Sequence, residues 1–256
     1  MKAIWKGSIN FGLVNIPVKL YSATQQSHLD LDMVDRRDMG KIHFKRVNEN
    51  TGKEIEWENI AKAYQLDGDY VILEDDDFEA AAPEKTKTIE VNHFVNENEI
   101  DTIYFENSYY IGPEKQGIKA YALLREALQK SGKVGLAQFI LRTSETLCVI
   151  KPMNELLVLS KIRFAEEIRS AEELTLPPKS LVKPDELKMA ITLIDQYTTP
   201  FYIDQYKDEY TSALLKVIKA RASGKKGKVR KLKAKESHTQ NLMEQLKASL
   251  SKSKIS

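Results

Sequence analysis

Cysteine and histidine are scarce in this chain. Among 256 residues the only cysteine is Cys148, and it stands in the apolar run 147–150, which indicates a buried thiol in the core. The four histidines are scattered: His28, His43, His93 and His238. Without a thiol pair or a closely spaced histidine pair, we expect no disulfide and no zinc site. The prediction is a protein without a metal or cofactor.

Long hydrophobic runs are also missing. No apolar stretch approaches the ~20 residues that a membrane-spanning helix needs. Residues 1–7 contain neither the hydrophobic region nor the cleavage site of a signal peptide. We therefore expect a cytoplasmic protein that has no membrane partner.

The common catalytic motifs are absent as well. The sequence has no Gly-x-x-x-x-Gly-Lys-Ser/Thr phosphate loop, no Gly-x-Gly-x-x-Gly fingerprint and no Gly-x-Ser-x-Gly nucleophile elbow. The acidic run 75–77 would suit a divalent metal only with a second carboxylate cluster nearby, and the first turn of a helix explains it equally well. These absences favour a binding protein over an enzyme.

Acidic and basic residues are unevenly distributed. The 29.2 kDa chain has a net charge of +2, with 42% hydrophobic and 30% charged residues, which is ordinary for a globular protein. Residues 216–256 nevertheless carry a net charge of +11, whereas residues 1–215 carry −9. A basic terminal segment on an acidic body indicates a polyanion partner.

Two hydrophobic periods divide the chain. A period of two predicts strands, and short turns between the later ones favour antiparallel pairing. We expect strands within 2–21 and at 69–73, 89–95, 103–111, 136–141, 146–150 and 156–163, short strands or a hairpin within 30–58 that include 42–47, and helices at 75–81 and 119–130. After Pro177, Pro178 and Pro184 the period becomes 3.6, which predicts further helices.

The domain organisation follows from these periods. We expect a mixed β+α protein with a β-rich body at 1–178, a helical arm at 179–222 and a basic tail at 223–256. The tail is too highly charged to form a core of its own. Within it, a short amphipathic stripe at 236–250 would dock on a partner, on the body, or on nothing.

Three groups of basic residues form the predicted phosphate-binding set, because phosphate contacts need only positive charge. One group lies in the body, one borders the predicted helix 119–130 and the strand after it, and one lies in the tail. The candidates are Arg36, Arg37, Lys41, Lys45, Arg46, Lys62, Lys130, Lys133, Arg142, Lys225, Lys226, Lys228, Arg230, Lys231, Lys233 and Lys235. The alternatives are a solubilising or membrane-surface tail and, in the body, ion pairs with nearby glutamates.

An aromatic group lies in the predicted strand 103–111. It comprises Tyr104, Phe105, Tyr109 and Tyr110. These rings would stack on bases in a nucleic-acid site, but packing within the strand core is the simpler interpretation.

Seven stretches, in the right order and covering about residues 2–222, resemble the bacterial Ku proteins. They are 4–21 (IWKGSINFGLVNIPVKLY), 44–47 (FKRV), 109–113 (YYIGP), 119–128 (KAYALLREAL), 141–143 (LRT), 162–167 (IRFAEE) and 186–190 (ELKMA). The resemblance implies an antiparallel β-barrel core with a C-terminal helical arm, in a homodimer that closes into a ring. Such a ring threads onto double-stranded DNA ends without reading bases. It then recruits a multifunctional ATP-dependent DNA ligase for non-homologous end joining, the repair of double-strand breaks.

The resemblance also ranks the site residues. Lys45 and Arg46 match the family's Lys-Arg pair before a valine, and Lys41 precedes them, so we expect all three in the DNA channel. Arg142 matches the family's Leu-Arg-Thr stretch and is a second candidate. The tail lysines match a feature that varies among members. An acidic body fits a ring whose basic residues face the channel and whose acids face outward.

Two other functions are compatible with the sequence. One is an end-independent, nucleoid-associated protein that binds any duplex through its tail, so that deleting 223–256 would remove most binding. The other is a lyase acting at abasic DNA ends, because Schiff-base chemistry needs only a lysine or the α-amine and no motif. The ring interpretation predicts instead a dimer, a need for free ends and little sequence preference.

Overall fold

The structure, a computed structural model, describes residues 1–256 except 28, 82–86, 142–143, 225–241 and 253–256. The described strands are β1 (Trp5–Phe11), β2 (Val14–Ser22), β3 (Lys62–Leu66), β4 (Asp69–Leu73), β5 (Thr88–Asn96), β6 (Phe105–Pro113), β7 (Lys133–Leu141), β8 (Ser144–Met153) and β9 (Leu156–Ile162). The described helices are α1 (Asp75–Ala81), α2 (Ile118–Ser131), α3 (Pro184–Tyr197), α4 (Glu209–Ala222) and α5 (Leu242–Lys252). Spatial contacts divide the chain into two units, Met1–Arg169 and Ser170–Ser256.

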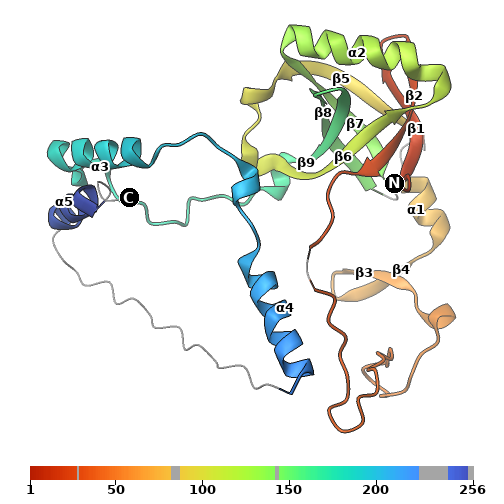
Figure 1. The fold of residues 1–256 in the computed structure, drawn as a ribbon. Helices are drawn as coiled ribbons and strands as arrows, with labels where there is room; N and C mark the ends of the chain where they lie inside the picture. Colours follow the sequence, from red (N-terminus) through yellow and green to blue (C-terminus); the bar gives the residue numbers. More distant parts are fainter. Residues whose placement is uncertain (28, 82–86, 142–143, 225–241, 253–256) are drawn as a thin grey trace. The chain divides into compact units, whose positions relative to one another are not determined.

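Seven strands of the first unit close into a barrel in the order β1-β2-β6-β9-β8-β7-β5 (Figure 1). Neighbouring strands pair in antiparallel fashion. The exception is the closure, where β1 runs parallel to β5 and Ser8 lies opposite Thr88. A closed barrel exposes no strand edge to other chains. The predicted antiparallel body in a mixed β+α protein is therefore confirmed.

Tight turns fix the register of the barrel hairpins. Phe11 lies opposite Val14, so Gly12 and Leu13 alone join β1 to β2, and Gly12 has a φ of +56°. Asn154 begins an equally short turn between β8 and β9 with a φ of 53°. Gly and Asn tolerate this left-handed region better than other residues do. The register matters because a slip of one residue would turn each core side chain outward.

The barrel interior is aliphatic. In β2, Ile16, Val18 and Leu20 alternate with exposed or half-exposed neighbours, and all three are fully buried. Strands β8 and β9 carry buried residues on both faces. Their outer face contributes to a second cluster, which is covered by the connection between β5 and β6 through Ile100 and Tyr104. These two strands therefore show the near-continuous apolar pattern of strands buried on both sides.

Helix α2 closes one end of the barrel, and Figure 1 shows it lying across the strands. Tyr121, Leu124 and Leu128 point into the barrel core at helical spacing. The Tyr121 hydroxyl donates a hydrogen bond to the carbonyl oxygen of Ile111 at 2.8 Å and accepts one from the N–H of Leu157 at 2.7 Å. One buried side chain thus joins α2 to β6 and β9.

The aromatic group of β6 belongs to the packing of the barrel. Tyr109 packs on the main core cluster, and Tyr104 and Phe105 pack on the second cluster. The prediction that these rings pack within the core, rather than stack on bases, is therefore confirmed for these three residues. Cys148 is also a core residue, as expected, and its burial raises the pKa of its thiol.

One predicted strand is wrong. Residues 42–47 form no strand: one isolated antiparallel bridge joins Val34 to Lys41 just before them, and another joins Val47 to Glu54 around the turn at 48–52. The alternation of apolar and polar residues across 42–47 does not reflect packing, because the side chains of this segment are exposed on both faces and several of them are charged. The hairpin β3–β4 forms instead further along the chain, with Lys62 opposite Leu73.

The second unit contains α3, α4 and α5. Neither α3 nor α4 has a buried residue. Helix α5 packs on α3, where Met243, Leu246 and Leu250 form the half-buried side of α5. The facing side of α3 carries the half-buried Ala190 and Leu193. The predicted sites for the amphipathic stripe were a partner, the body, or nothing; α5 packs instead on the helical arm, which was none of these three alternatives.

Candidate nucleic-acid interface

The body group of candidate cations lies in one long connection between β2 and β5. We term residues 23–87 the excursion. It holds Arg36, Arg37, Lys41, Lys45, Arg46 and Lys62. Outside its undescribed positions, 28 and 82–86, no excursion residue is buried. Its local structure consists of two isolated bridges, the short 3-10 helix Trp57–Asn59, the hairpin β3–β4 and α1, and its described side chains are exposed or half-exposed.

Three of these cations pair with carboxylates close by in the sequence. The pairs are Arg37 with Asp35 at 2.6 Å, Lys41 with Asp32 at 3.0 Å and Lys45 with Glu54 at 2.6 Å. The hydrogen bonds from Arg37 lower the pKa of the Asp35 carboxyl. Ion pairs this exposed contribute little stability, but each carboxylate competes with phosphate for its cation. The ion-pair alternative thus holds for half of the body group.

Two other cations lie on aromatic rings instead. The Arg46 guanidinium is 4.4 Å from the centroid of the Trp57 ring, and the Lys62 ammonium is 4.8 Å from the centroid of the Phe78 ring. Neither cation makes an ion pair within the described part of the chain. Arg36 likewise has no ion pair there. These three positive charges remain available to an anion.

The backbone explains how Trp57 reaches Arg46. The N–H of Ile55 donates to the carbonyl oxygen of Arg46 at 2.9 Å, and Val47 bridges to Glu54. Trp57 is therefore the diagonal neighbour of Arg46 across the two segments, within reach of a long side chain. Sequence reasoning missed both aromatic partners. The turn residues at 48–52, placed midway between Arg46 and Trp57, were the available signal.

The second basic group lies at the junction of α2 and β7. Lys130 stands exposed in the last turn of α2, and Gly132, in the left-handed region, ends the helix. The Lys133 ammonium donates to the side-chain oxygen of Asn96 at 2.7 Å, and hydrogen bonds from Asn96 together with the Lys133 charge lower the pKa of Glu99. Arg142 lies outside the described residues, as do Lys225, Lys226, Lys228, Arg230, Lys231, Lys233 and Lys235 of the tail.

Further cations on the barrel are paired with acids. Glu106 accepts from both Lys161, at 2.9 Å, and Arg163, at 3.1 Å, while Lys151 pairs with Glu97. Each of these cations has a carboxylate partner on the barrel surface. These cations therefore take part in ion pairs on the barrel and leave little positive charge available to an anion.

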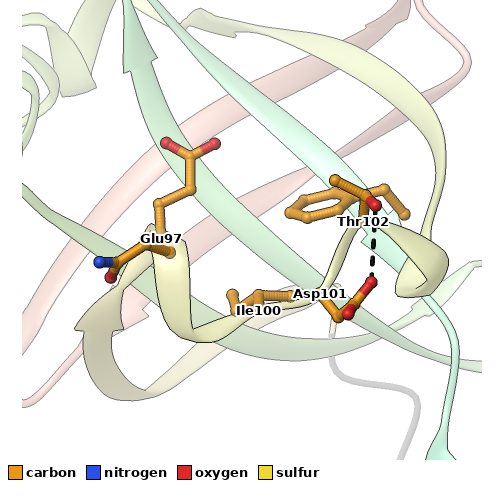
Figure 2. Close-up of a pocket in the computed structure, with 6 residues that line it drawn as sticks. Glu97, Ile100, Asp101 and Thr102 are labelled. Carbon is orange, nitrogen blue, oxygen red and sulfur yellow. Dashed lines mark hydrogen bonds between the residues drawn. The ribbon is translucent and has the colours of Figure 1, made fainter. Parts of the chain in front are cut away.

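A shallow depression on the barrel does not suit an anion. Glu97, Asn98, Ile100, Asp101, Thr102 and Phe105 line it. Figure 2 shows Glu97 on one side and Asp101 and Thr102 on the other, with the Thr102 hydroxyl 3.5 Å from an Asp101 oxygen. Its two carboxylates would repel phosphate.

The described residues offer neither a cluster of metal-ligating side chains nor a membrane-spanning helix. No group of three or more His, Cys, Asp or Glu residues is arranged there to hold a metal ion. No helix in that part of the chain is long and apolar enough to span a bilayer.

Comparison with known proteins identifies this barrel. The Ku70/Ku80 beta-barrel domain family matches residues 10–189. The non-homologous end joining protein Ku of Coxiella burnetii is 38% identical, over 86% of this chain and 82% of its own length. The proteins of the same name from Pseudomonas aeruginosa and Bacillus subtilis are each 40% identical, over 87% and 88% of this chain and 77% and 73% of their own lengths. The fold is thus a Ku-type β-barrel, and the chain belongs to the Ku family.

Proposed function

We propose that two copies of this chain form a ring that binds double-stranded DNA ends without reading their sequence. The ring then recruits and stimulates an ATP-dependent DNA ligase in non-homologous end joining. Membership of the Ku family supports this role, because the relatives compared above are named for that pathway. On this proposal the protein acts on nucleoid DNA in the cytoplasm, and its own role is binding rather than catalysis.

The observation that carries the proposal is the contrast between the barrel and its two extensions. The barrel has a complete core, whereas the excursion has no buried residue among those described, and neither do α3 and α4. A lone two-stranded hairpin and a 14-residue helix are each marginal in water by themselves, and α5 covers only one side of α3. A partner must therefore supply their packing, and a second copy of the chain meets this need for both extensions.

Exposed apolar side chains on the helical arm also support a second copy as the partner. Large exposed residues occur at many positions of this arm: Leu181, Leu187, Ile191, Ile194, Tyr197, Phe201, Tyr202 and Tyr206. So many large exposed apolar side chains in one part of the chain favour a protein–protein interface. We assign it to the second copy.

Contact with DNA would fall to predicted cations that make no ion pair within the described residues. Among the predicted cations these are Arg36, Arg46 and Lys62 in the excursion and Lys130 and Lys133 at the α2–β7 junction. Contacts of this kind are made to the phosphate backbone, so they position the protein without reading sequence. Arg142 and the tail lysines are proposed as additional contacts.

A competition gel shift tests end binding. A labelled linear duplex of about 40 base pairs competes with unlabelled linear DNA or with covalently closed circles of the same sequence, at one near-physiological salt concentration because affinity depends on salt. We expect linear DNA to compete and circles to fail. Equal competition would instead indicate an end-independent nucleoid protein, and deletion of 223–256 would then remove most binding.

Ligase recruitment needs a separate measurement. The rate at which an ATP-dependent end-joining ligase seals linear DNA would be compared with and without the protein, and with the variant Lys45→Glu/Arg46→Glu. We expect stimulation by the native protein and its loss in the variant. Tight end binding without any change in the sealing rate would refute the recruitment step alone.

A further inference from the structure

The excursion holds its cations in two different ways, and the difference is chemical. Lys45 and Arg46 are adjacent, yet Lys45 pairs with the carboxylate of Glu54 and Arg46 lies over the Trp57 ring. The second kind of partner occurs again further along the chain, where Lys62 lies over the ring of Phe78. These aromatic partners are not core residues, since Trp57 is 71% exposed and Phe78 is 38% exposed.

An aromatic ring restrains a cation without neutralising it. A carboxylate occupies N–H donors and cancels the charge, so a phosphate must displace it. A ring holds the flat face of the guanidinium through its negative quadrupole. The N–H groups of the guanidinium point outward in its own plane, where they make paired hydrogen bonds to phosphate oxygens. Stacking therefore reduces the freedom of the side chain while leaving its donors available.

We propose that Trp57 is a positioning residue for DNA binding: its ring holds the Arg46 guanidinium in place to receive a backbone phosphate. Phe78 likewise restrains the Lys62 ammonium, which would meet a phosphate as a point charge. This inference rests on the proposed function and adds two residues to the interface that contact cations rather than DNA. It also makes Arg46, rather than Lys45, the principal cation of the adjacent pair.

A double-mutant cycle between Trp57 and Arg46 tests the inference. The variants Trp57→Ala, Arg46→Ala and the double variant are compared by their dissociation constants for a blunt duplex at fixed salt. We expect Arg46→Ala to weaken binding about tenfold or more, and Trp57→Ala to weaken it about threefold to tenfold. If Trp57 acts through Arg46, its truncation costs nothing further once Arg46 is absent. Trp57→Phe keeps a ring and should restore most of the affinity.

Two outcomes would overturn the inference. If the losses from Trp57→Ala and Arg46→Ala add in full, Trp57 contacts DNA itself or acts only on local structure. If Arg46→Ala leaves binding and its salt dependence unchanged, Arg46 does not meet phosphate. In either case linear DNA can still outcompete circles, so the proposed function would stand. Failure of the native protein to prefer linear DNA would refute the proposed function instead.

Glu54→Gln provides a matched control on the neighbouring pair. It releases Lys45 from its carboxylate and leaves Arg46 and Trp57 untouched. We expect slightly tighter DNA binding from this variant, because a further positive charge becomes available. Weaker binding would mean that the ion pair, rather than free charge, organises this part of the excursion, and it would contradict the distinction drawn here.

Discussion

At the scale of single residues, Tyr121 links helix α2 to two barrel strands through hydrogen bonds, which the aliphatic side chains beside it cannot form. Its hydroxyl bonds to backbone groups of both β6 and β9 from within the core, and burial raises the pKa of the phenol. We predict that Tyr121→Phe destabilises the protein by about 1–3 kcal/mol, since it leaves a buried N–H and a buried carbonyl without a partner. Urea unfolding of the full chain measures the change.

Tyr109→Phe is the control for that substitution. Tyr109 also packs on the core cluster, but its hydroxyl makes no hydrogen bond within the described residues. Its removal should change the unfolding free energy by less than about 0.5 kcal/mol. Equal effects from the two variants would mean that ring packing, rather than the hydroxyl, carries the contribution of Tyr121.

At the scale of elements, hydrophobic period predicted the barrel well. The strands of the 136–163 region and helix α2 lie where their periods place them, because their apolar residues are buried, on both faces in β8 and β9, and Gly132 ends the helix as expected. The same method failed at 42–47, where alternation occurs without burial. An apolar–polar alternation predicts a strand only where its apolar side chains are packed against a neighbouring element.

The candidate site was less predictable for a related reason. The sequence identified the cations of the excursion but not their partners. Lys45 meets Glu54, nine positions along, and Arg46 meets Trp57 only because a turn brings the two segments together. Pairing of exposed side chains depends on such local geometry, which cannot be predicted from the composition of the chain.

Helix α5 provides the prediction at this scale. It has 11 residues, too few for a stable isolated helix, so its packing on α3 must hold it. We predict that Leu246→Glu speeds amide hydrogen exchange throughout α5, because it places a charge on the half-buried side. Lys247→Glu, on the exposed side, should leave exchange unchanged. Unaltered protection in Leu246→Glu would show that contacts other than this face hold the helix.

At the scale of the whole molecule, the two faces of α3 have different roles. One face is covered by α5 within the chain. On the adjacent face, Ile191 is 50% exposed and Ile194 is 65% exposed, and nothing in the described part of the chain covers them. Because α5 leaves this face open, it is the surface of α3 on which we expect a second copy to pack.

A double substitution on that open face tests the dimer. We predict that the native protein has a mass of twice 29.2 kDa by light scattering, and that Ile191→Glu/Ile194→Glu shifts it toward the monomer, since two charges cannot be buried against an apolar partner. The variant should also lose its preference for linear DNA, because a ring needs both copies. Leu123→Glu, at an isolated apolar residue of α2, should change neither property. If the double variant stays dimeric and still prefers linear DNA, the arm does not hold the two copies together, and the excursion becomes the surface that must join them.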